Sequence, residues 1–298
     1  MSSKPVVLIT GSSTGFGRLF AENLTRNGYT VFASMRDPQG KNAKNAAELL
    51  ALAERESLAI HTVELDVTSD ASVENAVRSV IAAAGRIDVA INNAGYPIVS
   101  LMESITSEQS QQIFETNFFG ALRVNRAVLP HMRRQRSGVL MHISSGAGRV
   151  VFPSFGIYCA SKYAMEAAAE AYRYELAGQG IESVILEPGA YETPIMGKFV
   201  FGADAARGET YGPVVKVPEL LSAALVKSAG NAQELADAVL QILKTPAGQK
   251  KLRYRVSPTD IGVDAINEVS EKVQNGLLHA FGLTDITAFR QQKAAASD

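Results

Sequence analysis

The residues best suited to chemistry lie in the run Tyr158-Cys159-Ala160-Ser161-Lys162, with Ser145 thirteen residues before the tyrosine. On a helix, positions i and i+4 share a face, so Tyr158 and Lys162 point the same way. A lysine ammonium beside a phenol stabilises the phenolate and lowers the tyrosine pKa from about 10, so that it exchanges a proton near neutral pH. The pair alone also fits a surface tyrosine beside a lysine with an apolar stem. The rest of the chain decides between the two.

A glycine-rich segment follows the first apolar run of the chain. Residues 5–10 are rich in valine and isoleucine, residues 11–17 read Gly-Ser-Ser-Thr-Gly-Phe-Gly, and an apolar-periodic segment follows. A strand, a glycine turn and a helix in this order predict the first unit of a dinucleotide-binding fold. The glycines let the backbone approach a pyrophosphate, and the helix start offers free N–H groups to it. The residues we expect to bind the cofactor here are Gly11, Ser13, Gly15, Phe16 and Gly17.

The end of the second predicted strand, 29–35, indicates which cofactor is used. NAD-selective sites place an acidic residue there to bind the ribose 2′-OH. This chain has Met35 followed by Arg36, and a guanidinium suits a 2′-phosphate. We therefore expect NADP(H) rather than NAD(H). The alternative is an exposed loop arginine paired with Asp37.

Strand-like and helix-like segments alternate along the chain. Strands are predicted at 61–65, 87–92, 138–144 and 181–186, and helices at 43–56, 70–84 and 107–130. This alternation predicts an α/β fold, a single doubly wound (Rossmann) parallel sheet with helices on both faces. We take residues 1–298 as one such domain, with ligands beyond the carboxyl ends of the strands.

Composition excludes several classes of protein. The net charge of −1 gives no broad attraction to nucleic acid, and the four scattered histidines predict no metal site. The single cysteine excludes an intramolecular disulfide and fits a reducing, cytoplasmic compartment. No apolar stretch approaches 18 residues, so we expect no membrane span, and the immediate first strand leaves no room for a signal peptide.

Six motifs stand in a fixed order along the chain. They are Thr10-Gly11-x-x-x-Gly15-x-Gly17, Asn92-Asn93-Ala94-Gly95, Asn117, Ser145, Tyr158-x-x-x-Lys162, and Pro188-Gly189 leading to Thr193. Together they resemble the short-chain dehydrogenase/reductase family over about residues 5–195, and the coarse α/β pattern extends the match to about 256.

The resemblance implies a role for each matching residue. Tyr158 would be the general acid in carbonyl reduction and the general base in alcohol oxidation. Lys162 would lower its pKa and hold the nicotinamide ribose. Ser145, favoured by spacing over its neighbour Ser144, would hydrogen-bond the substrate oxygen. Asn117 would hold a water of the proton relay, although taken singly it is a structural residue.

The resemblance also implies a wider cofactor site. Asp66 would contact the adenine and Thr193 the nicotinamide carboxamide. The cofactor-binding residues beyond the glycine loop and Arg36 are then Asp66, Val67, Asn93, Ala94, Gly95, Tyr158, Lys162, Pro188, Gly189 and Thr193.

The later part of the chain departs from the shorter family members. Residues 190–230 read as a substrate lid or an irregular surface loop, and residues 258–298 as a C-terminal extension with a helix-like segment. These features resemble the longer carbonyl-reductase and 17β-hydroxysteroid-dehydrogenase-like members. We expect a homo-oligomer, and both a dimer and the tetramer common in the family stay open.

These observations predict an NADPH-dependent carbonyl reductase acting on a hydrophobic ketone or aldehyde. The candidate pocket walls are Tyr96, Val151, Phe152, Phe155, Tyr191, Met196 and Phe199. One alternative is an NAD-linked alcohol dehydrogenase for a hydroxysteroid or retinol-like substrate. Another is a catalytically silent NADP-sensing protein, which would need neither Ser145, Tyr158 nor Lys162.

Overall fold

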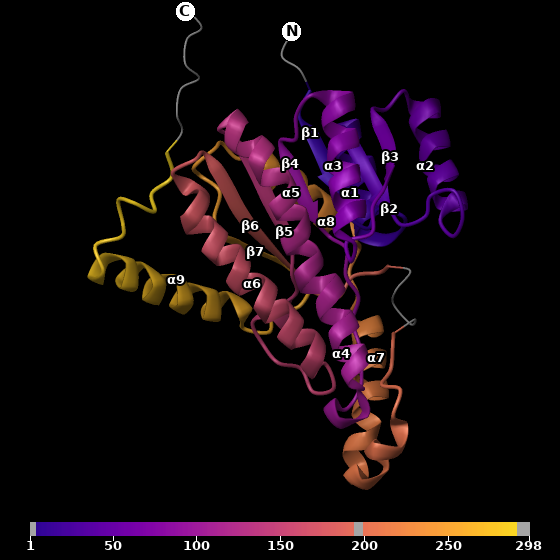
Figure 1. Cartoon of the computed structure of the whole chain (residues 1–298). Coiled ribbons are helices and arrows are strands. Elements are labelled where there is room, and N and C mark those ends of the chain that lie inside the picture. The colour runs from indigo at the N-terminus through magenta and orange to yellow at the C-terminus, as the bar shows by residue number, and fades with distance from the viewer. Residues whose placement is uncertain (1–3, 194–198, 291–298) are drawn as a thin grey trace, which may run out of the picture.

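Strands and helices alternate along the computed structural model, which describes residues 4–193 and 199–290 (Figure 1). The strands are β1 (Val6–Ile9), β2 (Thr30–Met35), β3 (Ile60–Glu64), β4 (Val89–Asn92), β5 (Gly138–Ile143), β6 (Ile181–Pro188) and β7 (Arg253–Val256). The α-helices are α1 (Gly15–Arg26), α2 (Ala43–Glu56), α3 (Asp70–Ala84), α4 (Ser107–Phe114), α5 (Gly120–Gln135), α6 (Gly156–Ala177), α7 (Val217–Lys227), α8 (Gln233–Lys244) and α9 (Val263–Ala280).

The described strands form one parallel sheet of seven strands, in the order β3-β2-β1-β4-β5-β6-β7. This confirms the predicted fold class. The order reverses between β1 and β4, and the crevice beyond such a switch point is where open α/β sheets bind ligands. The edge strand β7 was missed, because its sequence Arg-Tyr-Arg-Val is short and half charged.

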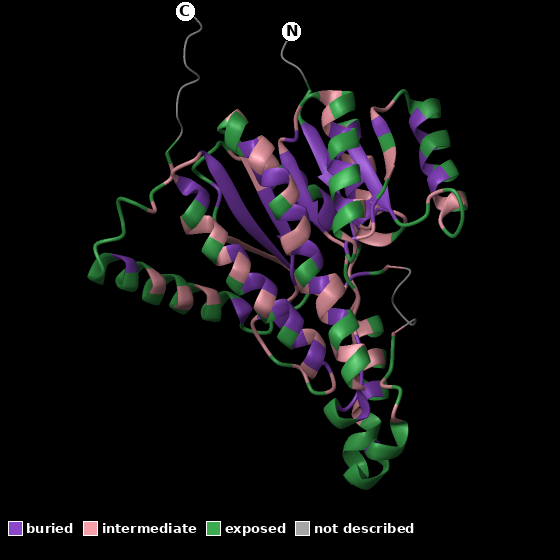
Figure 2. Ribbon diagram, in the orientation of Figure 1, coloured by how far each residue is buried: buried purple, intermediate pink, exposed green. Residues whose placement is uncertain are grey.

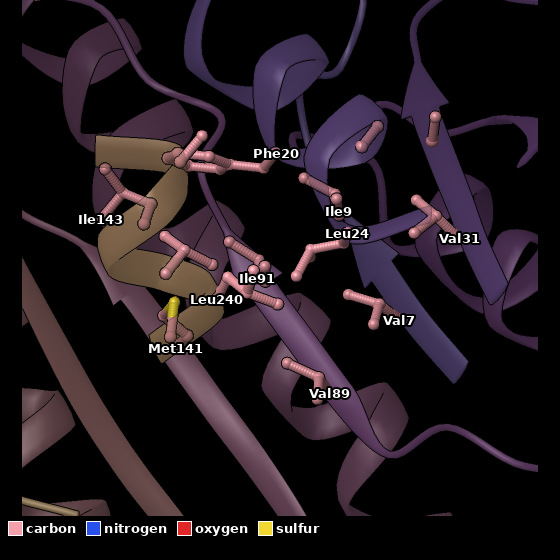
Figure 3. Packing of buried hydrophobic residues seen from close by; sticks show 14 of the residues in the cluster. Val7, Ile9, Phe20, Leu24, Val31, Val89, Ile91, Met141, Ile143 and Leu240 are labelled. Carbon is pink, nitrogen blue, oxygen red and sulfur yellow. The ribbon is translucent and has the colours of Figure 1, made fainter. Parts of the chain in front are cut away.

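Helices cover both faces of the sheet because the central strands are buried on both sides (Figure 2). On one face α1, α2 and α8 pack on side chains such as Ile9 and Ile91, and Phe20, Leu24 and Leu240 fill the space between (Figure 3). On the other face α3, α5 and α6 pack on the alternate residues of the same strands. This packing fixes the strand ends that carry the motifs.

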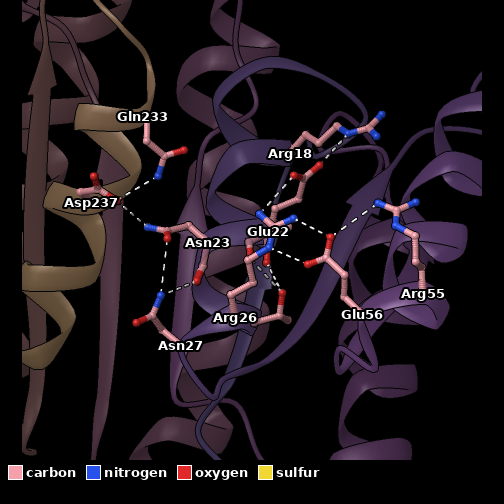
Figure 4. A network of polar contacts seen from close by, with 11 residues as sticks. Arg18, Glu22, Asn23, Arg26, Asn27, Arg55, Glu56, Gln233 and Asp237 are labelled. Carbon is pink, nitrogen blue, oxygen red and sulfur yellow. Dashed lines mark hydrogen bonds and ion pairs between the residues drawn. The ribbon is translucent and has the colours of Figure 1, made fainter.

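Polar contacts on the surface link α1 to its neighbours (Figure 4). The Arg26 guanidinium meets Glu56 of α2 at 2.7 Å, and Asn23 donates to Asp237 of α8 at 3.3 Å. Exposed pairs of this kind contribute little to stability, typically below about 1 kcal/mol. The buried side chains of α1 therefore hold the helix in place, with its N-terminus at the end of β1.

The predicted helix at 107–130 is longer than expected and is interrupted. A π-helical stretch, η2 (Glu115–Phe119), separates α4 from α5, and α5 continues through Pro130 to Gln135. A π-turn inserts one extra residue into the helix. Such a short insertion leaves the apolar pattern of the helix recognisable, so periodicity does not reveal it. Asn117 lies in this stretch.

Two segments project from the sheet in Figure 1. One contains the 3₁₀ stretch η4 (Ala205–Lys216) and α7, which fall in the predicted lid at 190–230. The other is α9 in the predicted extension at 258–298, in which Val263 and Leu278 alone are buried. Residues 194–198 and 291–298 of these predictions lie outside the described residues.

Candidate active site

The glycine loop is shaped to bring backbone close to a ligand. Gly11 and Gly15 have φ angles of +68° and +60°, which other residues rarely adopt. A Cβ on Gly17 would lie 2.5 Å from the Gly11 carbonyl oxygen and 2.6 Å from Asn93 Nδ2. The free N–H groups at the start of α1 follow directly, as a pyrophosphate requires. The loop therefore fits the dinucleotide predicted from the sequence.

Asn93 ties the ends of β1 and β4 together beneath this loop. Its Nδ2 donates to the carbonyl oxygens of Thr10 at 2.8 Å and Gly11 at 3.1 Å. The backbone N–H groups of Asn93 and Ala94 both donate to the Thr10 hydroxyl, at 2.9 and 3.0 Å. These four bonds hold the two strand ends on either side of the switch point.

A cavity of about 760 Å³ lies over the carboxyl ends of the strands and brings most predicted site residues together. The predicted residues lining it are Gly11, Ser13, Gly15, Phe16, Arg36, Asp66, Val67, Asn93, Ala94, Gly95, Ser145, Tyr158, Lys162, Pro188, Gly189 and Thr193. Gly17 and Asn117 do not line it. The cavity extends past the cofactor residues to aromatic side chains, so it has room for a second ligand.

Tyr158, Ser145 and Lys162 meet at the middle of the cavity. The Tyr158 phenol and the Ser145 hydroxyl are hydrogen-bonded. Lys162 Nζ lies 5.7 Å from the centroid of the Tyr158 ring and donates to the Ile143 carbonyl oxygen at 2.7 Å. The helix α6 places the tyrosine and the lysine on one face, as the i, i+4 spacing predicts.

The expected lowering of the tyrosine pKa is wrong for this structure. Burial raises the pKa of Tyr158 to about 12 and outweighs the opposite effect of the Ser145 hydrogen bond. Burial also lowers the pKa of Lys162 to about 8, against the charge of Glu166. The Lys162 ammonium donates to the Ile143 carbonyl oxygen and does not offset the effect of burial on Tyr158.

Asn117 is buried beside this group but its amide is already engaged. Its Nδ2 donates to the Tyr96 carbonyl oxygen at 3.0 Å and to the Ser161 hydroxyl at 3.1 Å, and its Oδ1 accepts from the Tyr96 N–H at 3.0 Å. These bonds attach η2 to the segment after β4 and to α6. The side chain serves as a structural link here.

Arg36 stands exposed at the rim of the cavity. Within residues 4–193 and 199–290 it forms no ion pair, and the Asp37 carboxylate instead accepts from the Lys41 N–H at 2.8 Å. The alternative of an Arg36–Asp37 pair is therefore wrong. Asp66 follows β3 and also lines the cavity. Its carboxylate accepts from the Thr68 N–H at 2.9 Å and from the Thr68 hydroxyl at 2.8 Å, which fixes its position.

Comparison with known proteins agrees with this geometry. The family model for short chain dehydrogenases matches residues 5–201. The chain belongs to the short-chain dehydrogenase family. It is an NAD(P)-dependent oxidoreductase that acts on CH–OH groups.

Two relatives and one structure show how far this similarity reaches. Human retinol dehydrogenase 8 is 34% identical over 277 residues, covering 87% of this chain and 85% of its own. The 3-ketodihydrosphingosine reductase of Bacteroides thetaiotaomicron is 36% identical over 188 residues, covering 63% and 64%. A short-chain dehydrogenase of Streptomyces avermitilis is similar in structure, with a TM-score of 0.75, 31% identity and coverage of 97% and 100%.

In this short-chain dehydrogenase, aromatic rings line the cavity beyond Tyr158. The Phe155 ring stands edge-on to Tyr158 at 5.7 Å and to Phe199 at 6.4 Å between centroids. Of the other predicted walls, Tyr96, Phe152 and Tyr191 line the cavity. Tyr191 is also part of the core against Phe16 and α8.

Two predicted wall residues are not found there. Val151 is 64% exposed and does not line the cavity, because the loop after β5 turns its side chain to solvent. Met196 lies outside the described residues.

Sequence reasoning missed part of the lining. Ala224 and Leu225 come from α7, and Ser257, Thr259 and Ile261 come from the loop after β7. The two α7 residues fall in the segment 190–230 predicted as a substrate lid, although they were not named as pocket walls. The loop residues form no pattern of their own, so only the fold brings them to the site. The apolar periodicity of α7 was the one available signal.

Two further findings concern only the residues that the structure describes. Within them, no helix is long and apolar enough to cross a membrane. The same residues contain no group of three or more His, Cys, Asp or Glu side chains arranged to hold a metal ion.

Proposed function

We propose that this enzyme is an NADPH-dependent carbonyl reductase with Tyr158 as the general acid. The observation that carries the proposal is the position of the Tyr158 phenol, which lines the cavity together with Ser145 and Lys162. Burial raises the pKa of this phenol to about 12. A group that keeps its proton at neutral pH is suited to give that proton to a developing alkoxide. The nearby Lys162 charge favours the phenolate that remains.

The residues divide the work between orientation and proton transfer. NADPH, when bound, supplies the hydride that goes to the carbonyl carbon. The Ser145 hydroxyl would donate to the carbonyl oxygen where negative charge develops. Tyr158 would then transfer its proton to that oxygen. The Ile143 carbonyl oxygen, which accepts from Lys162 Nζ, would hold the lysine near Tyr158. Phe155 and Phe199 would exclude water from the reacting atoms.

The choice of NADPH over NADH rests on Arg36. It follows β2 and lines the cavity as an exposed guanidinium that has no ion-pair partner among the described residues. A guanidinium binds phosphate oxygens through a planar fork of donors. Arg36 would therefore bind a 2′-phosphate, while Asp66 would lie near the adenine.

The substrate we propose is bulky and hydrophobic. The cavity wall beyond Tyr158 is formed by aromatic rings and by Leu225 of α7, and apolar walls select apolar ligands. The similarity to a retinol dehydrogenase and to a 3-ketodihydrosphingosine reductase supports the same size and polarity.

A second candidate is oxidation of an apolar alcohol in the same site. The similarity to retinol dehydrogenase 8 favours it. It requires Tyr158 as a base, and the burial that raises the pKa of Tyr158 opposes formation of the phenolate. Assays in both directions at pH 7 separate the two candidates.

The test is NADPH consumption at 340 nm across aldehydes, aryl ketones, steroid ketones and long-chain ketones. We expect turnover with the apolar ketones, and a loss of about 10²–10⁴-fold in Tyr158→Phe with NADPH affinity retained. Full activity in Tyr158→Phe would refute the assigned acid. Faster oxidation of the matching alcohols with NAD⁺ at pH 7 would favour the second candidate.

A further inference from the structure

A buried group of charged side chains lies directly beneath the Ser145 loop. The Ser144 hydroxyl donates to Glu166 Oε1 at 2.6 Å, and Glu166 is 2% exposed. Glu166 stands on α6 one turn after Lys162. The residue next to Ser145 in the chain is therefore attached to the same helix that carries Tyr158 and Lys162.

The other carboxylate oxygen of Glu166 is held by the edge strand β7. Arg253 Nε lies 3.0 Å from Glu166 Oε2, and its second branch donates to Glu170 at 2.7 Å. Arg253 is 7% exposed on its side chain. Removing one partner of a buried pair is costly because the other charge stays buried. Arg253 lies beyond residue 201, where the family match ends.

The loop backbone also packs on the Glu166 carboxylate. A Cβ on Gly148 would overlap Glu166 Oε1 and would lie 2.7 Å from the Ser144 hydroxyl. Residues Gly146–Gly148 form a 3₁₀ turn, and the Ala147 N–H donates to the Ser145 hydroxyl at 3.1 Å. Glu166 therefore supports both ends of the turn that presents Ser145.

The helix α9 completes the group from outside. Asn267 donates to Glu187 Oε2 at 2.6 Å, and Arg149 contacts both Ser270 and, at 4.0 Å, Glu166. The carboxylates of Glu166, Glu170 and Glu187 face the guanidinium groups of Arg149 and Arg253 here. Burial raises the pKa of Glu187 to about 7, so this third carboxylate is only partly ionised at neutral pH. The Lys162 ammonium stands one turn from Glu166, whose charge favours it.

We propose that Glu166 is a positioning residue for the reaction, which holds the Ser144–Ser145 loop in place and is itself fixed by Arg253. This rests on the proposed function of Ser145 and Tyr158. The edge strand β7 and the helix α9 then support the catalytic loop in addition to completing the fold. The charge of Glu166 also favours the ammonium form of Lys162, and its removal lowers the pKa of that lysine further.

The experiment compares Glu166→Gln and Ser144→Ala with Glu170→Gln as the matched control. Glu170 pairs with the same Arg253 but has no contact with the loop among the described residues. We expect kcat to fall about tenfold in the first two variants, with KM and the NADPH dissociation constant within about twofold. Glu170→Gln should lower the melting temperature and leave kcat unchanged.

The pH profile separates positioning from a merely structural role. In Glu166→Gln the loss of activity at high pH should begin below pH 8, because the pKa of Lys162 is lowered further. In Ser144→Ala the loss should begin at the same pH as in the wild type. Wild-type kcat and pH profile in Glu166→Gln would overturn the proposal, as would an equal loss of kcat in Glu170→Gln. If Glu166→Gln does not fold, Ser144→Ala decides through kcat.

Two further measurements distinguish a failure of the positioning role from a failure of the proposed function. Full activity in Tyr158→Phe refutes the reductase mechanism, whereas an inactive Tyr158→Phe beside a fully active Ser144→Ala refutes only the positioning role. If the wild type reduces no carbonyl, amide hydrogen exchange of residues 144–148 with NADPH bound still tests whether Glu166 holds the loop. Exchange at least about tenfold faster in Ser144→Ala, and not in Glu170→Gln, supports the positioning role, and equal rates overturn it.

Discussion

The two ends of the cavity are built differently. The cofactor end consists of short turns after β1, β3 and β4, tightly packed on the core and on one another. The substrate end is closed by Phe199, α7 and the loop 257–261, where many apolar side chains remain exposed. The first end constrains the backbone and so requires particular residues at fixed spacing. The second end requires only bulky apolar side chains, so its sequence is free to vary. No sequence motif there identifies the substrate.

The largest expected effect compares Gly17 at the cofactor end with Gly276 in α9, which lies outside the cavity. Gly17→Ala would place a methyl group against Gly11 and Asn93, whereas nothing lies within 4 Å of a Cβ on Gly276 in α9. Gly17→Ala should cost about 1–3 kcal/mol of unfolding free energy and abolish measurable NADPH binding. Gly276→Ala should add about 0.5–1 kcal/mol, as expected inside a helix. Chemical denaturation and fluorescence titration with NADPH measure both.

If Gly276→Ala destabilises the protein as much as Gly17→Ala, the close packing around Gly17 does not explain the sensitivity of the cofactor end. A partner packed closely on α9 would give that result.

The same contrast explains what the sequence alone predicts. The fold class and α2 at 43–56 and α3 at 70–84 follow from periodicity, and the glycine loop and Tyr158-x-x-x-Lys162 follow from fixed spacing. The interruption at Asn117 and the raised pKa of Tyr158 depend on how separate elements pack, which no local pattern records. Leu225 lines the cavity and Arg253 joins the buried group beneath the Ser145 loop. Both lie far along the chain from the motifs, and only the complete fold brings them there.

The pH dependence tests the electrostatics at the junction of the two ends. The pKa of Lys162 is lowered by burial to about 8, so its charge is present below pH 8 and is lost above it. Because the charge stabilises the phenolate left by proton transfer, kcat/KM for reduction should be level to pH 8. It should then fall about tenfold per pH unit. Activity recovered on return to pH 7 excludes denaturation, and a level profile up to pH 10 would rule out this role.

A smaller effect is expected at Arg36, on the rim of the cofactor end. Arg36→Asp removes the charge-assisted contact to a 2′-phosphate and adds repulsion, so the NADPH dissociation constant should rise about 10–100-fold. That of NADH should change little. Arg78→Asp on the exposed face of α3 alters the net charge equally and serves as the control. An unchanged preference for NADPH would mean that other residues bind the phosphate.

The smallest effect belongs to the substrate end. Phe199 lines the cavity edge-on to Phe155, while Phe201 is 52% exposed and does not line it. Removing a partly buried aromatic ring from an apolar wall loses roughly 1.5 kcal/mol of binding to a ligand that covers it. In Phe199→Ala we therefore expect KM to rise about tenfold for a bulky ketone and less than about twofold for a short aldehyde, while Phe201→Ala changes neither. An equal loss of kcat for both substrates would instead mean that Phe199 acts at the reacting atoms. The substrate end of the cavity would then be formed by α7 and not by Phe199.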